Sequence, residues 1–167
     1  MSNLALQHFL GRHQLPESYL SMAESAFSPL IDEFNTQYQV NQKTYIIGIN
    51  GCQGSGKSTL ADYLCTVVAE KYHLATVALS LDDFYLTKAE RIELARKIHP
   101  LLAQRGVPGT HDMALLNSTL DKLLGPPEPG PVAVPRFDKA RDERRRRSQW
   151  EQVEGRLDFV LLEGWCL

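Results

Sequence analysis

The chain of 167 residues is long enough for one domain that buries about two-thirds of its unfolded surface. Its formal net charge of −2 argues against a general nucleic-acid or membrane-surface binder, because such proteins carry an excess of Lys and Arg. Three cysteines without CxxC spacing argue against a disulfide framework or a zinc site and favour a cytoplasmic protein, and no apolar run approaches the roughly 20 residues that span a bilayer.

The first 42 residues predict a helical segment. Apolar side chains recur at irregular helical spacing on both sides of Pro16, and a proline suits the first turn of a helix. We therefore expect two helices that are separated near Pro16.

Strands and helices alternate along the rest of the chain. Apolar runs predict three strands at 45–49, 74–80 and 157–164, and helical patterns predict helices at 57–72, 87–98 and 113–124. Thr87 and Glu90 have the spacing of a capping box, and the segment GPPEPGP (125–131) ends the last of these helices. The remaining segments predict a loop at 99–112, a short extended piece at 132–137 and a polar helix at 138–150. Apolar strands alternating with helices predict an α/β fold with a mostly parallel sheet in three α/β/α layers.

A phosphate-binding loop follows the first predicted strand. The residues from Gly51 to Ser58 fit the pattern G-x-x-x-x-G-K-[ST] without a mismatch. Glycines let main-chain N–H groups approach phosphate oxygens closely, and the N-terminus of the next helix favours the same anion. We expect Lys57 to reach the β- and γ-phosphates and the Ser58 hydroxyl to ligate Mg²⁺. The predicted nucleotide-binding residues are Gly51, Cys52, Gln53, Gly54, Ser55, Gly56, Lys57, Ser58 and Thr59.

Acidic residues end the other two apolar runs. Asp82 and Asp83 follow the second predicted strand, and Glu163 lies at the end of the third. Ligands of open α/β sheets bind beyond the carboxyl ends of the strands, so we expect these acids to converge on the phosphate loop. Acids beside a magnesium triphosphate can hold the metal or accept a proton from an attacking hydroxyl. For each acid taken alone, a helix cap or a solvated turn is the alternative.

Five motifs together resemble the D-glycerate 3-kinase type of P-loop kinase, a family similar to uridine kinase, phosphoribulokinase and bacterial pantothenate kinase. They are GINGCQGSGKSTLADYL, SLDDFYLT, HPLLAQRGVPGTHD, VPRFDKARDERRRRSQW and VLLEGWC. The resemblance implies an ATP-dependent kinase, with ATP and Mg²⁺ as cofactors, that phosphorylates a hydroxyl of a small molecule, with D-glycerate as the first candidate. It also implies a P-loop kinase domain over residues 43–167, preceded by the helical segment 1–42. A uridine- or pantothenate-type kinase and a catalytically incomplete nucleotide-binding module stay open as alternatives.

The resemblance also implies roles for single residues. Asp82 matches the catalytic base of these kinases, Asp83 is its neighbour and can help with the metal, and Glu163 matches the acid that supports Mg²⁺ through water. With Lys57, the two aspartates form the predicted catalytic set. The predicted substrate-binding residues are Asp112, Arg136, Phe137, Asp142 and Arg144.

An acid such as glycerate needs a cation for its carboxylate, because an arginine fork pairs bidentately with that group. The candidates are Arg105, Arg136, Lys139 and Arg144. Asp142 stands where related kinases have a histidine, which makes a uridine-like acceptor less fitting. For Arg145, Arg146 and Arg147 we favour a solvated helix face.

Family members continue past VLLEGWC with further strands and an arginine-bearing lid, so we expect this chain to be incomplete at its C-terminus. In these kinases the strand that ends in the acid lies between the other two, so the first strand would be a sheet edge. An apolar edge of this kind can pair with another chain, which makes self-association a further expectation.

Overall fold

A computed structural model of the chain describes residues 3–126 and 129–167. The chain folds into two compact units, the first made of Met1–Ala78 and Arg156–Leu167 and the second of Leu79–Gly155. The domain boundary after residue 42 stays a prediction. Among the described residues, no helix is both long enough and apolar enough to cross a lipid bilayer.

A parallel sheet forms the centre of the first unit. β1 (Tyr45–Asn50) pairs in parallel with β7 (Phe159–Gly164), and β2 (Thr76–Ser80) completes the order β1-β7-β2. The expected central position of the last strand is therefore confirmed. All of β7 is buried, as expected for a central strand of a parallel sheet, whereas every second residue of β1 is exposed.

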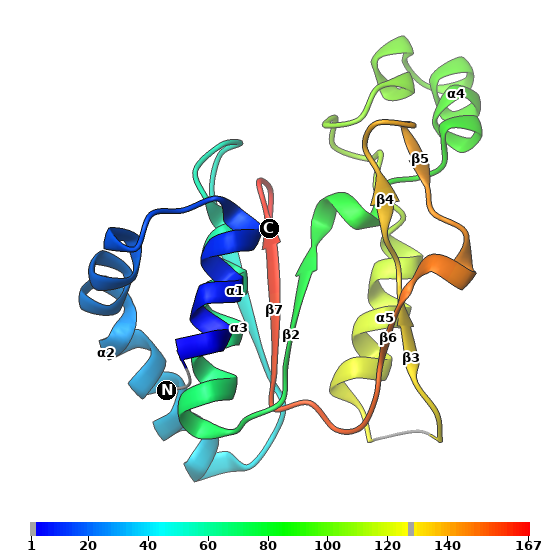
Figure 1. The fold of residues 1–167 in the computed structure, drawn as a ribbon. Coiled ribbons are helices and arrows are strands. Elements are labelled where there is room, and N and C mark those ends of the chain that lie inside the picture. Colours follow the sequence, from blue (N-terminus) through cyan, green and yellow to red (C-terminus); the bar gives the residue numbers. More distant parts are fainter. Residues whose placement is uncertain (1–2, 127–128) are drawn as a thin grey trace. The chain divides into compact units, whose positions relative to one another are not determined.

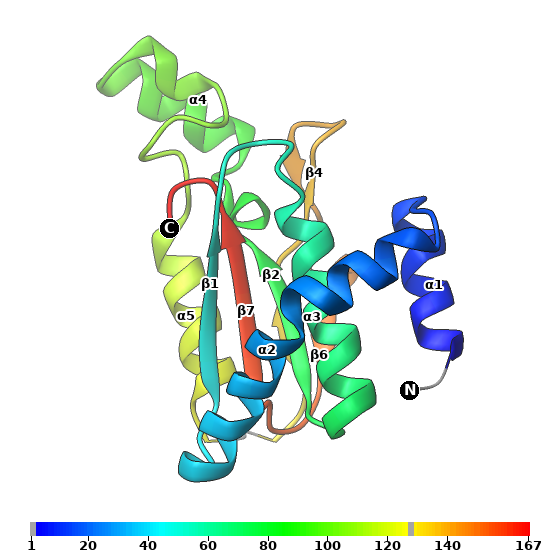
Figure 2. The same ribbon diagram turned by 90° about the vertical axis from the view of Figure 1, so that its left-hand side faces the viewer.

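Three helices lie on one side of β1 and β7 (Figures 1 and 2). α3 (Lys57–Tyr72) packs directly on both strands, and α1 (Asn3–His13) and α2 (Ser18–Asn41) pack on α3. Phe9 of α1 is completely buried, with its ring centroid 5.6 Å from that of Tyr63 on α3. The two helices predicted on either side of Pro16 are therefore confirmed, and their apolar faces belong to the same core as the sheet.

Within its described residues, 79–126 and 129–155, the second unit contains two α-helices, two short antiparallel strand pairs and three 3₁₀ turns. The α-helices are α4 (Lys88–Lys97) and α5 (Met113–Leu124). The strand pairs are β3 (Val132–Val134) with β6 (Glu151–Val153), and β4 (Phe137–Asp138) with β5 (Glu143–Arg144). The 3₁₀ turns are η1 (Leu81–Phe84), η2 (Pro100–Ala103) and η3 (Arg147–Gln149).

The helices of the second unit begin where the sequence predicts. Thr87 and Glu90 form the expected capping box, in which the Thr87 hydroxyl accepts the Glu90 N–H and the Glu90 carboxylate accepts the Thr87 N–H. α5 has the predicted bounds. Pro127 and Glu128, part of the segment expected to end this helix, lie outside the described residues.

The helix predicted over 138–150 is wrong. Those residues form the β4–β5 hairpin and η3 instead, so Arg145, Arg146 and Arg147 do not share a helix face. The Asp138 side chain accepts the N–H groups of Ala140 and Arg141, and such a contact favours a turn over a helix. Because the stretch has no apolar stripe, a helix formed by it would bury no apolar face. No free energy of packing would therefore favour the helix over the turn.

Replacing Phe9 with Ala is expected to lower the free energy of unfolding by about 3–5 kcal/mol, because it empties a completely buried aromatic site between α1 and α3. Urea denaturation measures the change. Leu4→Ala is the matched control on α1, where the side chain is 65% exposed, and it should change stability by less than about 0.5 kcal/mol. Equal effects of the two substitutions would contradict the docking of α1 on the core.

Candidate active site

The phosphate loop connects β1 to α3, and its backbone requires glycine. Gly54 and Gly56 have φ angles of 76° and 86°, in the left-handed region that other residues seldom occupy. At Gly51 a Cβ atom would lie only 3.0 Å from Ser55 Oγ and 3.5 Å from the Lys57 side chain. The glycines therefore permit a tight main-chain cradle of the kind that anions bind.

The Lys57 side chain is bonded to the main chain of this loop. Its Nζ donates a hydrogen bond of 2.8 Å to the carbonyl oxygen of Cys52. The loop residues from Cys52 to Gly56 are exposed, so an anionic ligand can approach the same ammonium group.

Ser58 and Glu163 meet at the carboxyl end of β7. The Ser58 hydroxyl donates a hydrogen bond of 2.9 Å to Glu163 Oε1, and Glu163 is only 7% exposed. The Gly51 N–H also donates to the Gly164 carbonyl at 3.2 Å, which ties the start of the loop to the end of the strand. The predicted pairing of loop and acid is therefore present in the first unit.

The donor atoms at this point fit Mg²⁺. The ion prefers oxygen ligands and usually takes only one or two from the protein, the rest coming from phosphate and water. Ser58 and Glu163 offer a hydroxyl and a carboxylate 2.9 Å apart. In the described part of the chain no cluster of three or more His, Cys, Asp or Glu side chains is placed to hold a metal ion.

Asp82 and Asp83 lie in η1 of the second unit, each against a cation. Lys139 Nζ donates to Asp82 Oδ2 at 2.7 Å, and Arg136 donates to Asp83 Oδ2 at 2.9 Å. Asp83 Oδ1 also accepts the Phe137 N–H at 2.9 Å. Burial raises the pKa of Asp83, and the hydrogen bonds from Phe137 and Arg136 only partly oppose that effect. Asp83 thus fixes the start of β4, whereas Asp82 pairs with Lys139, whose side chain is 63% exposed.

Asp112 combines a structural role with an ion pair. Its carboxylate caps α5 by accepting the Leu115 N–H at 3.0 Å, and its other oxygen accepts from Arg144 at 2.9 Å. Arg144 also donates to the Tyr85 carbonyl at 2.8 Å. Asp112 is therefore both the N-cap of α5 and the partner of Arg144.

Asp142 lies at the turn of the hairpin with a φ angle of 56° and joins two arginines. Arg91 donates to its Oδ1 at 2.7 Å, and Arg105 lies 2.8 Å from the same atom. The Arg105 guanidinium also lies 5.3 Å from the ring centroid of Phe137. No sequence pattern singles out Arg91, which is completely buried although it lies on a mostly polar helix.

The predicted substrate residues therefore lie together in the second unit and are already paired. The candidate cations contact carboxylates as follows: Arg105 with Asp142, Arg136 with Asp83 and Glu151, Lys139 with Asp82, and Arg144 with Asp112. An acceptor carboxylate would have to join or replace one of these pairs. Because the phosphate loop belongs to the other unit, its convergence with Asp82 stays a prediction.

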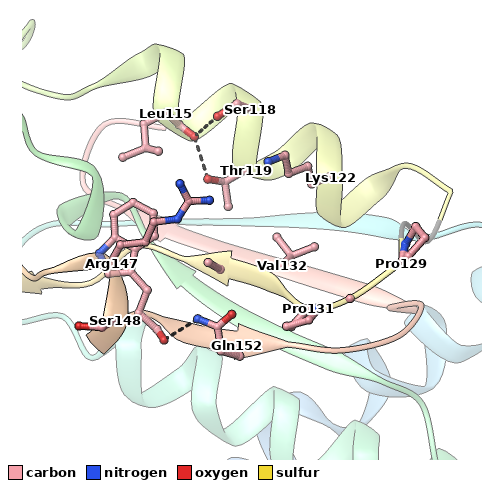
Figure 3. Close-up of a pocket in the computed structure, with 13 residues that line it drawn as sticks. Leu115, Ser118, Thr119, Lys122, Pro129, Pro131, Val132, Arg147, Ser148 and Gln152 are labelled. Atoms are coloured by element: carbon pink, nitrogen blue, oxygen red, sulfur yellow. Dashed lines mark hydrogen bonds between the residues drawn. The ribbon is translucent and has the colours of Figure 1, made fainter.

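A cavity of about 680 Å³ lies between α5 and the β3–β6 pair (Figure 3). Lys122 and Arg147 contribute cations to its wall, and Ser118 and Thr119 turn their hydroxyls back to the Leu115 carbonyl. None of the predicted site residues lines this cavity. We therefore do not assign the acceptor to it.

Replacing Asp142 with Asn is expected to destabilise the protein by about 2 kcal/mol. The change removes the charge that compensates the buried Arg91, while asparagine still accepts the positive φ angle of the turn. The expected loss of stability is smaller than for a fully buried ion pair, because the Asp142 side chain is 31% exposed. Thermal or urea unfolding measures the loss, and Glu93→Gln, in an exposed pair on α4, should leave stability unchanged. An equally stable Asp142→Asn variant would contradict the importance of this pair.

Comparison with known proteins gives a consistent group of relatives, although no protein-family model matches the chain. An uncharacterized kinase of Schizosaccharomyces pombe, mug58, is 38% identical over 156 residues, which are 89% of this chain and 55% of that protein. The chloroplastic D-glycerate 3-kinase of Arabidopsis thaliana is 39% identical over 132 residues, 73% of this chain and 28% of that protein.

Solved structures agree with the sequence matches. D-glycerate 3-kinase from Cryptococcus neoformans superposes with a TM-score of 0.70 and 30% identity, over 86% of this chain and 52% of that one. The chain thus spans about half the length of that structure and of the fission-yeast relative. The predicted α/β fold of a P-loop protein, a parallel sheet with flanking helices, is confirmed. By sequence and by fold, the chain belongs to the P-loop kinases that include D-glycerate 3-kinase.

Proposed function

We propose that the protein carrying this chain is an ATP-dependent kinase that transfers a phosphoryl group to a hydroxyl of a small acid, with D-glycerate as the first acceptor. The observation that carries the proposal is the complete phosphate loop whose Ser58 hydroxyl is bonded to Glu163. The plant and Cryptococcus relatives named D-glycerate 3-kinase support the choice of acceptor.

The nucleotide site would use the loop from Gly51 to Thr59. Main-chain N–H groups of the loop would bind the phosphates, and Lys57 would exchange the Cys52 carbonyl for a phosphate oxygen. Ser58 and Glu163 would hold Mg²⁺, which neutralises phosphate charge when it is bound. Positioning and electrostatic stabilisation provide most of the acceleration in reactions of this class.

The acceptor site would use the ion-pair cluster of the second unit. Asp82 is the best placed base because its one described partner, Lys139, is an exposed and flexible side chain. Asp83 is held by Arg136 and the Phe137 N–H, so it would position the hairpin rather than exchange a proton. Arg144 keeps an Nε without a partner among the described residues, which makes it the first candidate for the acceptor carboxylate.

Other acceptors and a role without catalysis are the alternatives to this proposal. Uridine- and pantothenate-type acceptors remain alternatives because kinases with those names are also among the relatives, at 31% and 28% identity. A nucleotide-binding module without transfer activity is the alternative outside enzymes. A cytoplasmic location and self-association through the β1 edge, where Ile46 is 46% exposed, stay predictions.

A coupled assay of ADP release with D-glycerate, uridine and pantothenate tests the reaction in the protein at its natural length. D-glycerate should give the highest kcat/KM, and Lys57→Ala should lower it by about 100-fold or more, because the substitution removes a cation that faces the transferred phosphoryl group. Lys97→Ala, an exposed lysine at the end of α4, is the matched control and should behave as the unaltered protein. Stabilisation by Mg-ATP without ADP release on any acceptor would instead support the binding module.

Asp82→Asn is expected to lower kcat by about 100-fold or more while the Kd for Mg-ATP stays unchanged, because general-base catalysis contributes on that scale. Steady-state kinetics and calorimetric titration measure the two quantities. Asp121→Asn, at an exposed position on α5, should change neither. Normal turnover of the Asp82→Asn variant would remove this residue from the mechanism.

A further inference from the structure

A hollow of about 430 Å³ lies beside the phosphate loop in the first unit. One side of it consists of loop and α3 residues, including Gly56, Lys57 and Thr59. The other side consists of residues from the helical segment 1–42, including Tyr19, Met22 and Phe27. Two segments that the sequence gives no reason to connect therefore share one ligand-sized space.

We infer that the N-terminal helices form the wall against which the base and ribose of the bound nucleotide pack. The inference rests on the proposed function, since it concerns the nucleotide whose phosphates the loop would hold. In a nucleoside triphosphate the ribose joins the base to the α-phosphate, so the base must lie next to the phosphate cradle. The hollow offers that position, because Gly56, Lys57 and Thr59 belong both to the predicted cradle and to its lining.

The chemistry of the wall fits a heterocyclic base. Tyr19 and Phe27 are half-buried aromatic residues, and Met22 is 52% exposed. Aromatic rings stack on the flat face of any base, and a methionine side chain adapts to the space that remains. Among the described residues that line the hollow, Lys57 carries the only charge, so the region beyond the loop suits an uncharged ring better than a second phosphate.

The wall is held in place before any ligand arrives. The Tyr19 ring lies 5.8 Å from the Phe9 ring and 6.4 Å, edge to face, from that of Tyr63, and Phe27 lies 6.3 Å from Tyr63. Tyr63 belongs to α3, whose first turn is part of the phosphate loop. The same helix therefore fixes both the cradle and the aromatic wall.

Polar contacts at the C-terminal end of α1 also hold this helix against α3. Arg12 and His13 contact Asp62 of α3 at 2.9 and 2.8 Å, and the Thr59 hydroxyl lies 3.3 Å from His13. A preformed site loses less conformational freedom when its ligand binds, which favours tight binding.

Titration of the protein at its natural length with Mg-ATP and with magnesium tripolyphosphate tests the inference. Tripolyphosphate presents the phosphates without base or ribose, so it isolates the contribution of the loop. The unaltered protein should bind Mg-ATP at least about 10-fold more tightly, because one stacked base contributes on that scale. Equal affinities for the two ligands would overturn the base wall and leave the phosphate loop intact.

Tyr19→Leu and Phe27→Leu keep apolar packing but remove the flat rings. Each should weaken Mg-ATP binding by about 5- to 10-fold without changing tripolyphosphate binding. Phe34→Leu is the matched control: Phe34 is half-buried on α2, packs on Phe159 at 6.1 Å and does not line the hollow.

The outcomes separate the two proposals. Unchanged Mg-ATP binding in both variants, or an equal loss in Phe34→Leu, would contradict the assignment of the hollow to the base. If the unaltered protein binds neither ligand, the proposed function fails, and the base wall fails with it.

Discussion

The parallel pairing of β1 with β7 is the contact on which the candidate nucleotide site depends. The register sets Ile49 opposite Glu163 and Asn50 opposite Gly164, so both strands end at the same level. The loop that leaves β1 is tied to the end of β7 by the Gly51 N–H, and Ser58 then meets the Glu163 carboxylate. Residues 105 positions apart in the chain thus come within hydrogen-bond distance.

The second unit is organised around a cluster of ion pairs that brings many charged side chains close together. Its acids and bases compensate one another, and Asp142 holds the buried Arg91 while it also turns the hairpin. Such a cluster keeps arginine forks at defined positions, which suits recognition of a small anion. If the acceptor binds in this cluster, as proposed, it would compete with carboxylates of the protein, and its recognition would depend on exchange of ion pairs.

Sequence patterns are sufficient to predict those features of the fold and the site that depend on neighbouring residues in the chain. The bounds of α3 and α5, the capping box at Thr87 and the phosphate loop all follow from short-range spacing. The β4–β5 hairpin does not follow from such spacing, because its turn depends on side-chain contacts of Asp138 that hydrophobic periodicity does not detect. Arg91 was missed for a related reason: its partner Asp142 is 51 residues away, and nothing local marks a buried arginine on a polar helix. The hollow between α2 and the loop likewise required the packing of distant segments.

A crystal structure with Mg²⁺ and a non-hydrolysable ATP analogue tests the central claim most directly. The account predicts the triphosphate inside the loop from Gly51 to Ser58, with Lys57 Nζ moved from the Cys52 carbonyl to a phosphate oxygen and the metal beside Ser58 and Glu163. A nucleotide bound elsewhere, with the Lys57–Cys52 and Ser58–Glu163 contacts unchanged, would contradict it.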